Sequence, residues 1–298
     1  MYGVSPAYFI SRFGPAFSVG DVQTCLPDLI RLGFGAFQPE VYLGERIGAW
    51  QMGARTLGRT ARDEGLVTTQ FVAHFLLHEF GNSSVLRSNR YRDSVQRVIE
   101  IVFNIQNCPT IVVPIPRYEP ETTELNDALL VADAYRRFEN RIADMLEMVE
   151  AAGLRLGLEI LPGSLVGGSE GFLHLADRLE SASLGYCFDT GHAWSSHEQV
   201  LLIPGRLGKR IVGTHLCDNE GMENLSVRPG SGTIDWRLLT AALLGAGYTG
   251  SWDIEIGCAP ELVESEYLTA LRHLRGVRGE ETKERYNDQT GSHHIVSG

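Results

Sequence analysis

Cysteine is scarce in this 298-residue sequence, and its placement excludes several classes of protein. There are five cysteines, an odd number; they lie far apart, and none belongs to a CxxC motif. Disulfide frameworks and cysteine-based zinc sites usually contain closely spaced pairs of cysteines. The pattern therefore indicates reduced thiols and favours a cytoplasmic location.

Long apolar stretches are also missing. No window reaches the roughly 18 uninterrupted apolar residues that a membrane-spanning helix requires. The first residues, MYGVSPAYFISRFG, lack a basic segment followed by an apolar one. We therefore expect no signal peptide and no membrane partner.

Basic residues are outnumbered. The sequence has 26 Lys and Arg against 37 Asp and Glu, a formal net charge of −11. Such a chain gains little from releasing the counterions of DNA or RNA, so we expect no nucleic-acid partner. Apolar residues make up 43% of the chain and charged residues 21%, which is ordinary for a globular protein able to bury a large core.

Short apolar runs alternate with longer helical patterns along the whole chain. Several runs, such as TIVVPI and RIVGTHL, are almost continuously apolar, as in parallel strands covered on both faces. The predicted strands cover 2–10, 34–41, 67–74, 109–115, 154–161, 184–189, 211–217 and 250–256. The clearest predicted helices cover 21–33, 84–106, 126–153 and 234–247, and three of them end in glycine.

This alternation predicts an α/β fold, a single-domain (β/α)8 barrel over residues 1–279. A doubly wound open sheet is the alternative, but it usually carries a glycine-rich nucleotide loop after its first strand. Neither GxGxxG nor GxxxxGK[ST] occurs there. The last residues, 280–298, are polar and aperiodic, and we expect them to form a mobile tail.

Acid or imidazole side chains lie at the ends of four consecutive predicted strands. They are Glu159, Asp189, His215 and Glu255, separated by 30, 26 and 40 residues, about one βα unit each. Since strand ends meet at one face of a barrel, these side chains can converge on one point. Three carboxylates and one imidazole favour one divalent cation, with manganese preferred and magnesium, cobalt or zinc as alternatives.

Any one of these residues has a simpler explanation. A single acid at a strand end can cap a helix or join a salt bridge. Four of them near a barrel axis are costly without compensation, and a bound cation removes that cost. The four together therefore predict a metal site.

The motifs around these residues resemble those of a known superfamily. LGLEI, YCFDTGHA, THLCDNEG, RPGSGTIDW and SWDIEI, in this order and spacing, are similar to the xylose-isomerase-like TIM barrels. That group includes D-tagatose 3-epimerase, inosose dehydratase, hydroxypyruvate isomerase and endonuclease IV. The resemblance covers about residues 150–256; upstream, Glu40 and His74 stand where the superfamily often has polar strand-end residues.

The resemblance implies a role for each matched residue. Glu159, Asp189, His215 and Glu255 would bind the metal, and the two glutamates would also transfer protons. His192 would contact substrate, with Gly191 before it allowing a tight turn. The implied reaction is isomerisation or epimerisation of a small carbohydrate, a ketose or keto-polyol, by proton abstraction beside a carbonyl and a metal-stabilised enediolate.

Further substrate contacts are expected from His74, Arg117, Arg228 and Trp194. The structural alternatives are a role outside the pocket for His74 and a salt bridge for either arginine. Trp194 and Trp252 flank the proposed site, and core packing is the alternative for Trp252. Endonuclease IV has an Asp-x-His segment where this sequence has Ser226-Val227-Arg228. Serine and arginine are not usual metal ligands, so a three-metal phosphodiesterase site is not expected.

Two other functions remain open. The same residues can support elimination, as in inosose dehydratase or the barrel subunit of C-glycoside deglycosidases. A barrel could also keep its ligands and only bind sugar. We expect a homo-oligomer, or a hetero-oligomer if the chain is a deglycosidase-type subunit.

Overall fold

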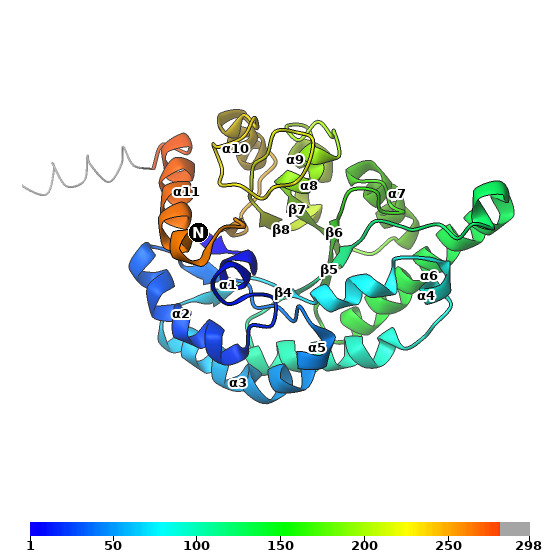
Figure 1. Ribbon diagram of the computed structural model, residues 1–298, viewed down its shortest axis with the longest axis horizontal. Coiled ribbons are helices and arrows are strands. Elements are labelled where there is room, and N and C mark those ends of the chain that lie inside the picture. Colours follow the sequence, from blue (N-terminus) through cyan, green and yellow to red (C-terminus); the bar gives the residue numbers. More distant parts are fainter. Residues whose placement is uncertain (281–298) are drawn as a thin grey trace, which may run out of the picture.

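Parallel strands run around a closed barrel in the computed structural model, which describes residues 1–280 (Figure 1). The strands pair in two groups, with the orders β3-β2-β1-β9 and β4-β5-β6-β7-β8. Backbone bridges between Glu40 and Val72, and between Leu216 and Ile254, join the two groups. The predicted α/β barrel is confirmed. The strands are β1 (Tyr2–Val4), β2 (Ala36–Phe37), β3 (Val67–Thr68), β4 (Phe71–Val72), β5 (Thr110–Ile115), β6 (Arg155–Ile160), β7 (Leu184–Asp189), β8 (Ile211–His215) and β9 (Trp252–Ile254).

Helices surround the strands (Figure 1). They are α1 (Ala7–Phe13), α2 (Val19–Leu32), α3 (Ile47–Asp63), α4 (Ser83–Leu86), α5 (Tyr91–Ile105), α6 (Ala128–Ala151), α7 (Ser169–Leu179), α8 (Thr190–Ser195), α9 (Ile203–Leu207), α10 (Trp236–Gly245) and α11 (Val263–Val277). Short 3-10 turns cover 44–46, 74–79, 124–126, 208–210 and 260–262.

Three predicted helices are confirmed within two residues at each end, namely α2, α6 and α10. The glycines predicted to follow them, Gly33, Gly153 and Gly247, have φ angles of 91°, 70° and 76°. Such positive φ angles suit glycine and end a helix in a tight turn towards the next strand.

The strands predicted over 2–10 and 67–74 were wrong in part. The strand predicted over 2–10 ends at Val4, and α1 follows. The apolar run continues into α1 because Tyr8 and Phe9 are buried helical residues, and a short apolar run does not distinguish strand from helix. The predicted strand 67–74 is interrupted into β3 and β4, and it ends at Val72.

The helix predicted over 84–106 is two helices, α4 and α5, separated by residues 87–90. The guanidinium of Arg141, which is only 3% exposed, donates to the backbone carbonyls of Glu79, Val85 and Ser88. Because these carbonyls bind a side chain from α6, the chain leaves the helical path before α5 begins.

Small side chains fill the barrel interior below the strand ends. Val72, Val112 and Cys187 form a buried cluster there, and Gln70 donates to the thiol of Cys187 over 3.4 Å. A Cβ on Gly213 would lie 2.0 Å from the amide oxygen of Gln70, so glycine makes room for this layer. This layer of the interior is therefore packed with side chains.

Three remaining sequence predictions concern the chain as a whole. All five cysteines are free thiols, as predicted. Across residues 1–280, no helix combines the length and apolar character needed to cross a membrane. The predicted tail at 280–298 lies, apart from Glu280, outside the described residues.

Candidate metal centre

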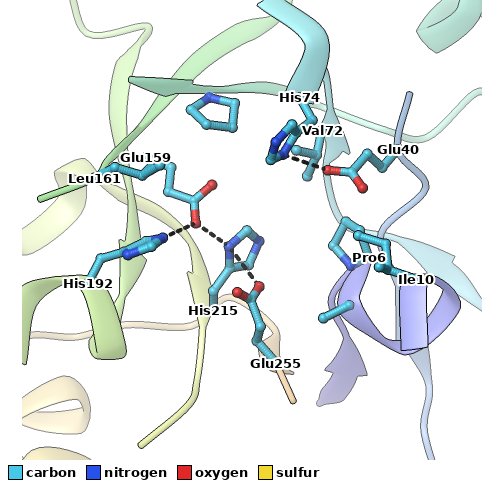
Figure 2. Close-up of a pocket in the computed structure, with 12 residues that line it drawn as sticks. Pro6, Ile10, Glu40, Val72, His74, Glu159, Leu161, His192, His215 and Glu255 are labelled. Atoms are coloured by element: carbon cyan, nitrogen blue, oxygen red, sulfur yellow. Dashed lines mark hydrogen bonds and ion pairs between the residues drawn. The ribbon is translucent and has the colours of Figure 1, made fainter. Parts of the chain in front are cut away.

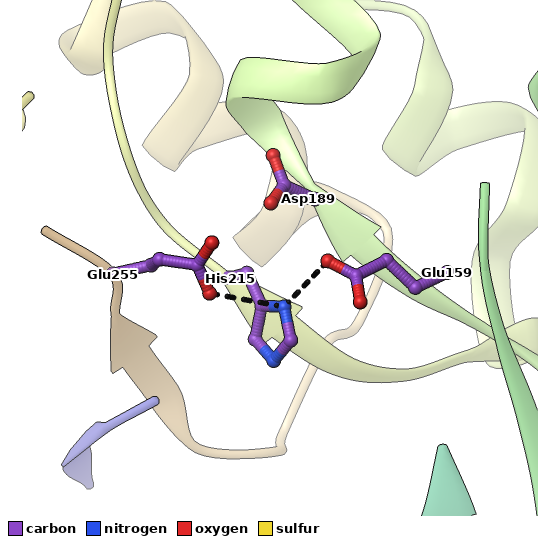
Figure 3. A group of neighbouring side chains, drawn as sticks. All are labelled: Glu159, Asp189, His215 and Glu255. Carbon is purple, nitrogen blue, oxygen red and sulfur yellow. Dashed lines mark hydrogen bonds and ion pairs between the residues drawn. The ribbon is translucent and has the colours of Figure 1, made fainter. Parts of the chain in front are cut away.

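Four predicted ligands converge at the ends of consecutive strands. Glu159 comes from β6, Asp189 ends β7, His215 ends β8 and Glu255 follows β9. One ligand atom of each lies within 4.8 Å of the others, and Figure 3 shows the four side chains pointing towards one another. Nδ1 of His215 lies 2.8 Å from Oε1 of Glu159 and 3.2 Å from Oε2 of Glu255. The convergence predicted from strand spacing is thus present.

A second layer of polar residues orients His215. Its Nε2 lies 2.8 Å from Oε1 of Gln38, whose own amide nitrogen donates to Oδ2 of Asp253 over 2.8 Å. An amide oxygen can only accept, so Nε2 carries a proton and Nδ1 faces the carboxylates, to which the charged ring donates its second proton in the absence of a cation. This arrangement presents Nδ1 as a ligand atom, as in metal sites where a second residue holds the histidine ring.

Asp189 has one satisfied and one unsatisfied oxygen. Oδ1 caps α8 by accepting from the backbone N–H of His192 over 2.7 Å, and the thiol of Cys217 lies 3.6 Å away. Oδ2 is buried and has no hydrogen-bond partner in residues 1–280. A buried carboxylate oxygen without a partner is costly, and a cation at the centre of the cluster would remove that cost.

Without a cation, the pKa values of the three carboxyl groups in the cluster are strongly shifted. Burial and the neighbouring Glu159 raise the pKa of Asp189 to about 7. Burial also raises the pKa of Glu255 to about 7. Burial acts in the same direction on Glu159, but His215 more than offsets it and lowers that pKa to about 2.

His215 stays protonated although it is buried. Burial acts to lower its pKa, but Cys187, Glu159 and Glu255 together raise it well above the usual value. Burial raises the pKa of the Cys187 thiol to about 11, so this thiol is neutral near pH 7 and the two glutamates are the effective cause. The cluster therefore holds excess negative charge near neutral pH, which fits a divalent metal site.

A small cavity of about 100 Å³ opens beside these ligands. Figure 2 shows Glu159, His192, His215 and Glu255 on one side, with Glu40 and His74 on the opposite side. The apolar residues that line the pocket are Pro6, Ala7, Ile10, Val72, Pro114 and Leu161.

Glu40 and His74 form the far polar wall of this pocket. Oε1 of Glu40 lies 3.3 Å from Nδ1 of His74, and the imidazole stacks on Tyr42 with the ring centroids 4.1 Å apart. Oε2 of Glu40 is buried and has no hydrogen-bond partner in the described part of the chain. Burial raises the pKa of Glu40, which opposes ionisation of this carboxyl group.

His192 lines the pocket beside the ligands. Its Nε2 lies 3.9 Å from Oε1 of Glu159 and 3.8 Å from Oδ2 of Asp189, beyond hydrogen-bond distance of both. Gly191 before it lies in the first turn of α8 and has no positive φ angle. A Cβ there would lie 2.3 Å from Oδ1 of Asn224, so glycine permits close approach of that loop.

The structure does not bring the other three predicted substrate contacts to this pocket. Both oxygens of Glu266 lie 3.0 Å from Arg228, so the salt-bridge alternative describes this arginine. The side chain of Arg117 is 77% exposed and pairs with Glu119 over 3.4 Å. The indole N–H of Trp194 donates to Thr233 over 2.9 Å. Substrate contacts from these three residues stay predictions.

Several site residues were not predicted as functional. Gln38 and Asp253 each precede an acid of the site by two residues, in FQPE and WDIE. Since strand side chains alternate, residues two apart face the same side, and this spacing could have identified both. The sequence does not identify Ala7 and Ile10, because the run that contains them fits a strand as well as a buried helix.

Comparisons with known proteins agree with this architecture. The sequence profile described as xylose isomerase-like TIM barrel matches residues 27–277. Two relatives are uncharacterized proteins: MJ1311 of Methanocaldococcus jannaschii, 26% identical over 181 residues, and y4fM of Sinorhizobium fredii, 31% identical over 167. The matches cover 59% and 52% of this chain, and 60% and 49% of those relatives, so the chain spans only about half of their length.

Solved structures share the fold over most of the chain. An L-ribulose 3-epimerase is 16% identical and covers 99% of both chains, with a TM-score of 0.71. A D-tagatose 3-epimerase-like protein is 20% identical, with a TM-score of 0.69, over 92% of this chain and 98% of its own. The IOLI protein, solved with a zinc atom, is 14% identical, with a TM-score of 0.70, over 93% of this chain and 96% of its own.

Proposed function

Because the chain belongs to the xylose isomerase-like TIM barrel family, we propose that it is a divalent-metal-dependent isomerase or epimerase of a small carbohydrate. The observation that carries the proposal is the convergence of four ligand atoms within 4.8 Å at the edge of a small pocket. The L-ribulose 3-epimerase with the same fold is a supporting likeness.

Glu159, Asp189, His215 and Glu255 would hold the ion. Their oxygen-rich donor set favours manganese, with magnesium, cobalt or zinc as alternatives. When bound, the ion would supply Lewis acidity towards a substrate carbonyl and adjacent hydroxyl. Asp189 contributes an oxygen that is buried and without a hydrogen-bond partner within residues 1–280.

Glu159 and Glu255 are suited to move the proton. Both line the pocket, and they approach Nδ1 of His215 from different strands, each through one oxygen. The second oxygen of each carboxylate can take a proton from carbon on one side of the substrate or return it on the other. Two carboxylates so placed support transfer at adjacent carbons as well as inversion at one carbon.

The rest of the pocket supports a small polyhydroxylated substrate. Polar groups stand at both ends, with Glu40 and His74 opposite the cluster, and apolar side chains lie between them (Figure 2). Hydroxyl groups at the far end of a sugar can satisfy the buried Oε2 of Glu40. The cavity of about 100 Å³ favours a short substrate.

The test is proton exchange in D₂O, followed by NMR, with metal-loaded protein and a panel of ketoses, inososes and 3-keto-glycosides. We expect deuterium at the carbon next to the carbonyl of at least one substrate. E159Q and E255Q should lower the rate at least about 100-fold, as expected for loss of a general acid or base. Glu64 is exposed at the end of α3, so E64Q is the matched control and should retain the wild-type rate.

The same spectra separate the alternatives. Release of water or of an aglycone would show that the reaction is an elimination and not an isomerisation. No exchange and no product from any member of the panel would overturn the proposal. Stoichiometric metal in the wild type, lost in D189N, is expected independently from elemental analysis.

A further inference from the structure

The loop that follows β8, residues 216–235, places Asn224 against the ring of His192. Nδ2 of Asn224 lies 3.1 Å from Nδ1 of His192, on the side of the ring away from the pocket. This contact spans 32 residues and depends on Gly191, where a side chain would meet Asn224.

The orientation of the Asn224 amide follows from its other contacts. Oδ1 accepts from the backbone N–H of Ser226 over 3.0 Å and from the Ser226 hydroxyl over 3.4 Å. The thiol of Cys217 lies 3.8 Å from the same oxygen. Only an oxygen can accept from a backbone N–H, so the NH₂ group must face His192.

An NH₂ group only donates, so Nδ1 of His192 must accept. The neutral ring then carries its proton on Nε2. That nitrogen lies 3.9 Å from Oε1 of Glu159 and 3.8 Å from Oδ2 of Asp189. The N–H bond is therefore presented to the space beside the ligand cluster and is engaged by neither carboxylate.

The loop is held firmly enough to impose this choice. Asp218 is fully buried and accepts from the backbone N–H groups of Gly230 and Ile234 over 3.0 and 3.2 Å. It also accepts from the indole N–H of Trp236 over 2.7 Å. These contacts join Asp218, which precedes Asn224, to the residues that follow it in and after the loop.

We propose that Asn224 is a positioning residue that holds His192 as the Nε2–H tautomer, so that the ring donates a hydrogen bond to a substrate oxygen. The identity of the acceptor rests on the proposed function, whereas the tautomer does not. The ligand would be a small sugar, and the acceptor would be its carbonyl or hydroxyl oxygen next to the part that binds the metal.

The test is the tautomer itself, read by NMR in protein labelled with ¹⁵N-histidine and loaded with magnesium, which is diamagnetic. His192 signals are assigned by their loss in H192N. In the wild type we expect an unprotonated Nδ1 and a protonated Nε2. A protonated Nδ1 in the neutral ring would overturn the proposal, and this result needs no variant.

N224D provides the second arm. The aspartate keeps one oxygen for Ser226 and turns the other towards Nδ1 of His192. A carboxylate oxygen only accepts, so in the neutral ring the proton should move from Nε2 to Nδ1. Asn89 is exposed, so N89D makes the same charge change elsewhere and should leave the tautomer unchanged. An unchanged tautomer in folded N224D would overturn the proposal.

Activity separates this inference from the proposed function. On a substrate found by the exchange panel, N224D should lower kcat/KM about tenfold, as for one lost hydrogen bond. A confirmed tautomer without turnover of any sugar would refute the function alone. Turnover with wild-type kcat/KM in N224D would refute the substrate contact of His192.

Discussion

Removing divalent cations should make the stability of this protein fall as pH rises. In the chelated protein, burial raises the pKa of Asp189 from 3.8 to about 7, and that of Glu255 from 4.5 to about 7. Each carboxyl therefore binds its proton more tightly in the folded than in the unfolded chain. The stability that this contributes is fully present below about pH 4 and is lost as pH rises through about 7.

The magnitude follows from about 1.4 kcal/mol per pH unit. Asp189 alone corresponds to about 4 kcal/mol, and Glu255 to about 3 kcal/mol. Because each acid contributes to the shift of the other, the two values overlap. We expect the free energy of unfolding to fall by about 4 kcal/mol between pH 4 and pH 8 because of this cluster.

Urea unfolding in EDTA across this pH range, compared with unfolding in manganese, measures the effect. D189N is the matched variant, because asparagine still caps α8 but cannot ionise. It should show a shallower fall and little response to metal, whereas the wild type should gain about 2.7 kcal/mol with the metal at 100 times its Kd. A chelated wild type that parallels D189N at every pH would refute the reasoning.

Two further predictions test residues outside the ligand set. Q38L removes the acceptor that orients His215, and we expect metal affinity to fall about 10- to 100-fold by calorimetry, whereas an unchanged Kd would contradict this role. R141M removes the donor for three backbone carbonyls in the segment 79–88, and should lower the free energy of unfolding by about 3 kcal/mol in urea. A loss below about 1 kcal/mol would show that these carbonyls find other partners.

The convergence of the four candidate ligands could be predicted because it depends on local patterns and on strand order. Strands in a parallel barrel end at one face, so regularly spaced strand-end acids converge whatever the loops do. Glu159, Asp189, His215 and Glu255 required no knowledge of side-chain rotamers. The strand predicted over 2–10 is wrong beyond Val4 because this mostly apolar stretch fits a strand followed by a buried helix equally well.

The role of Arg228 could not be predicted from the sequence. The sequence allows Arg228 to be a substrate contact or a salt-bridge partner, and no neighbouring residue distinguishes the two roles. Its partner, Glu266, lies 38 residues away on α11. An ion pair of this kind is decided by how a loop packs on a distant helix.

The sequence by itself determined the barrel and the convergence of four candidate metal ligands, because side-chain alternation and strand-end positions are set by local periodicity. Only the tertiary structure decided which nitrogen of each histidine faces the site. Nε2 of His215 bonds Gln38 across 177 residues, and Nδ1 of His192 bonds Asn224 across 32. A ring nitrogen takes its role from the partner that reaches it, and that partner is chosen by the folded chain.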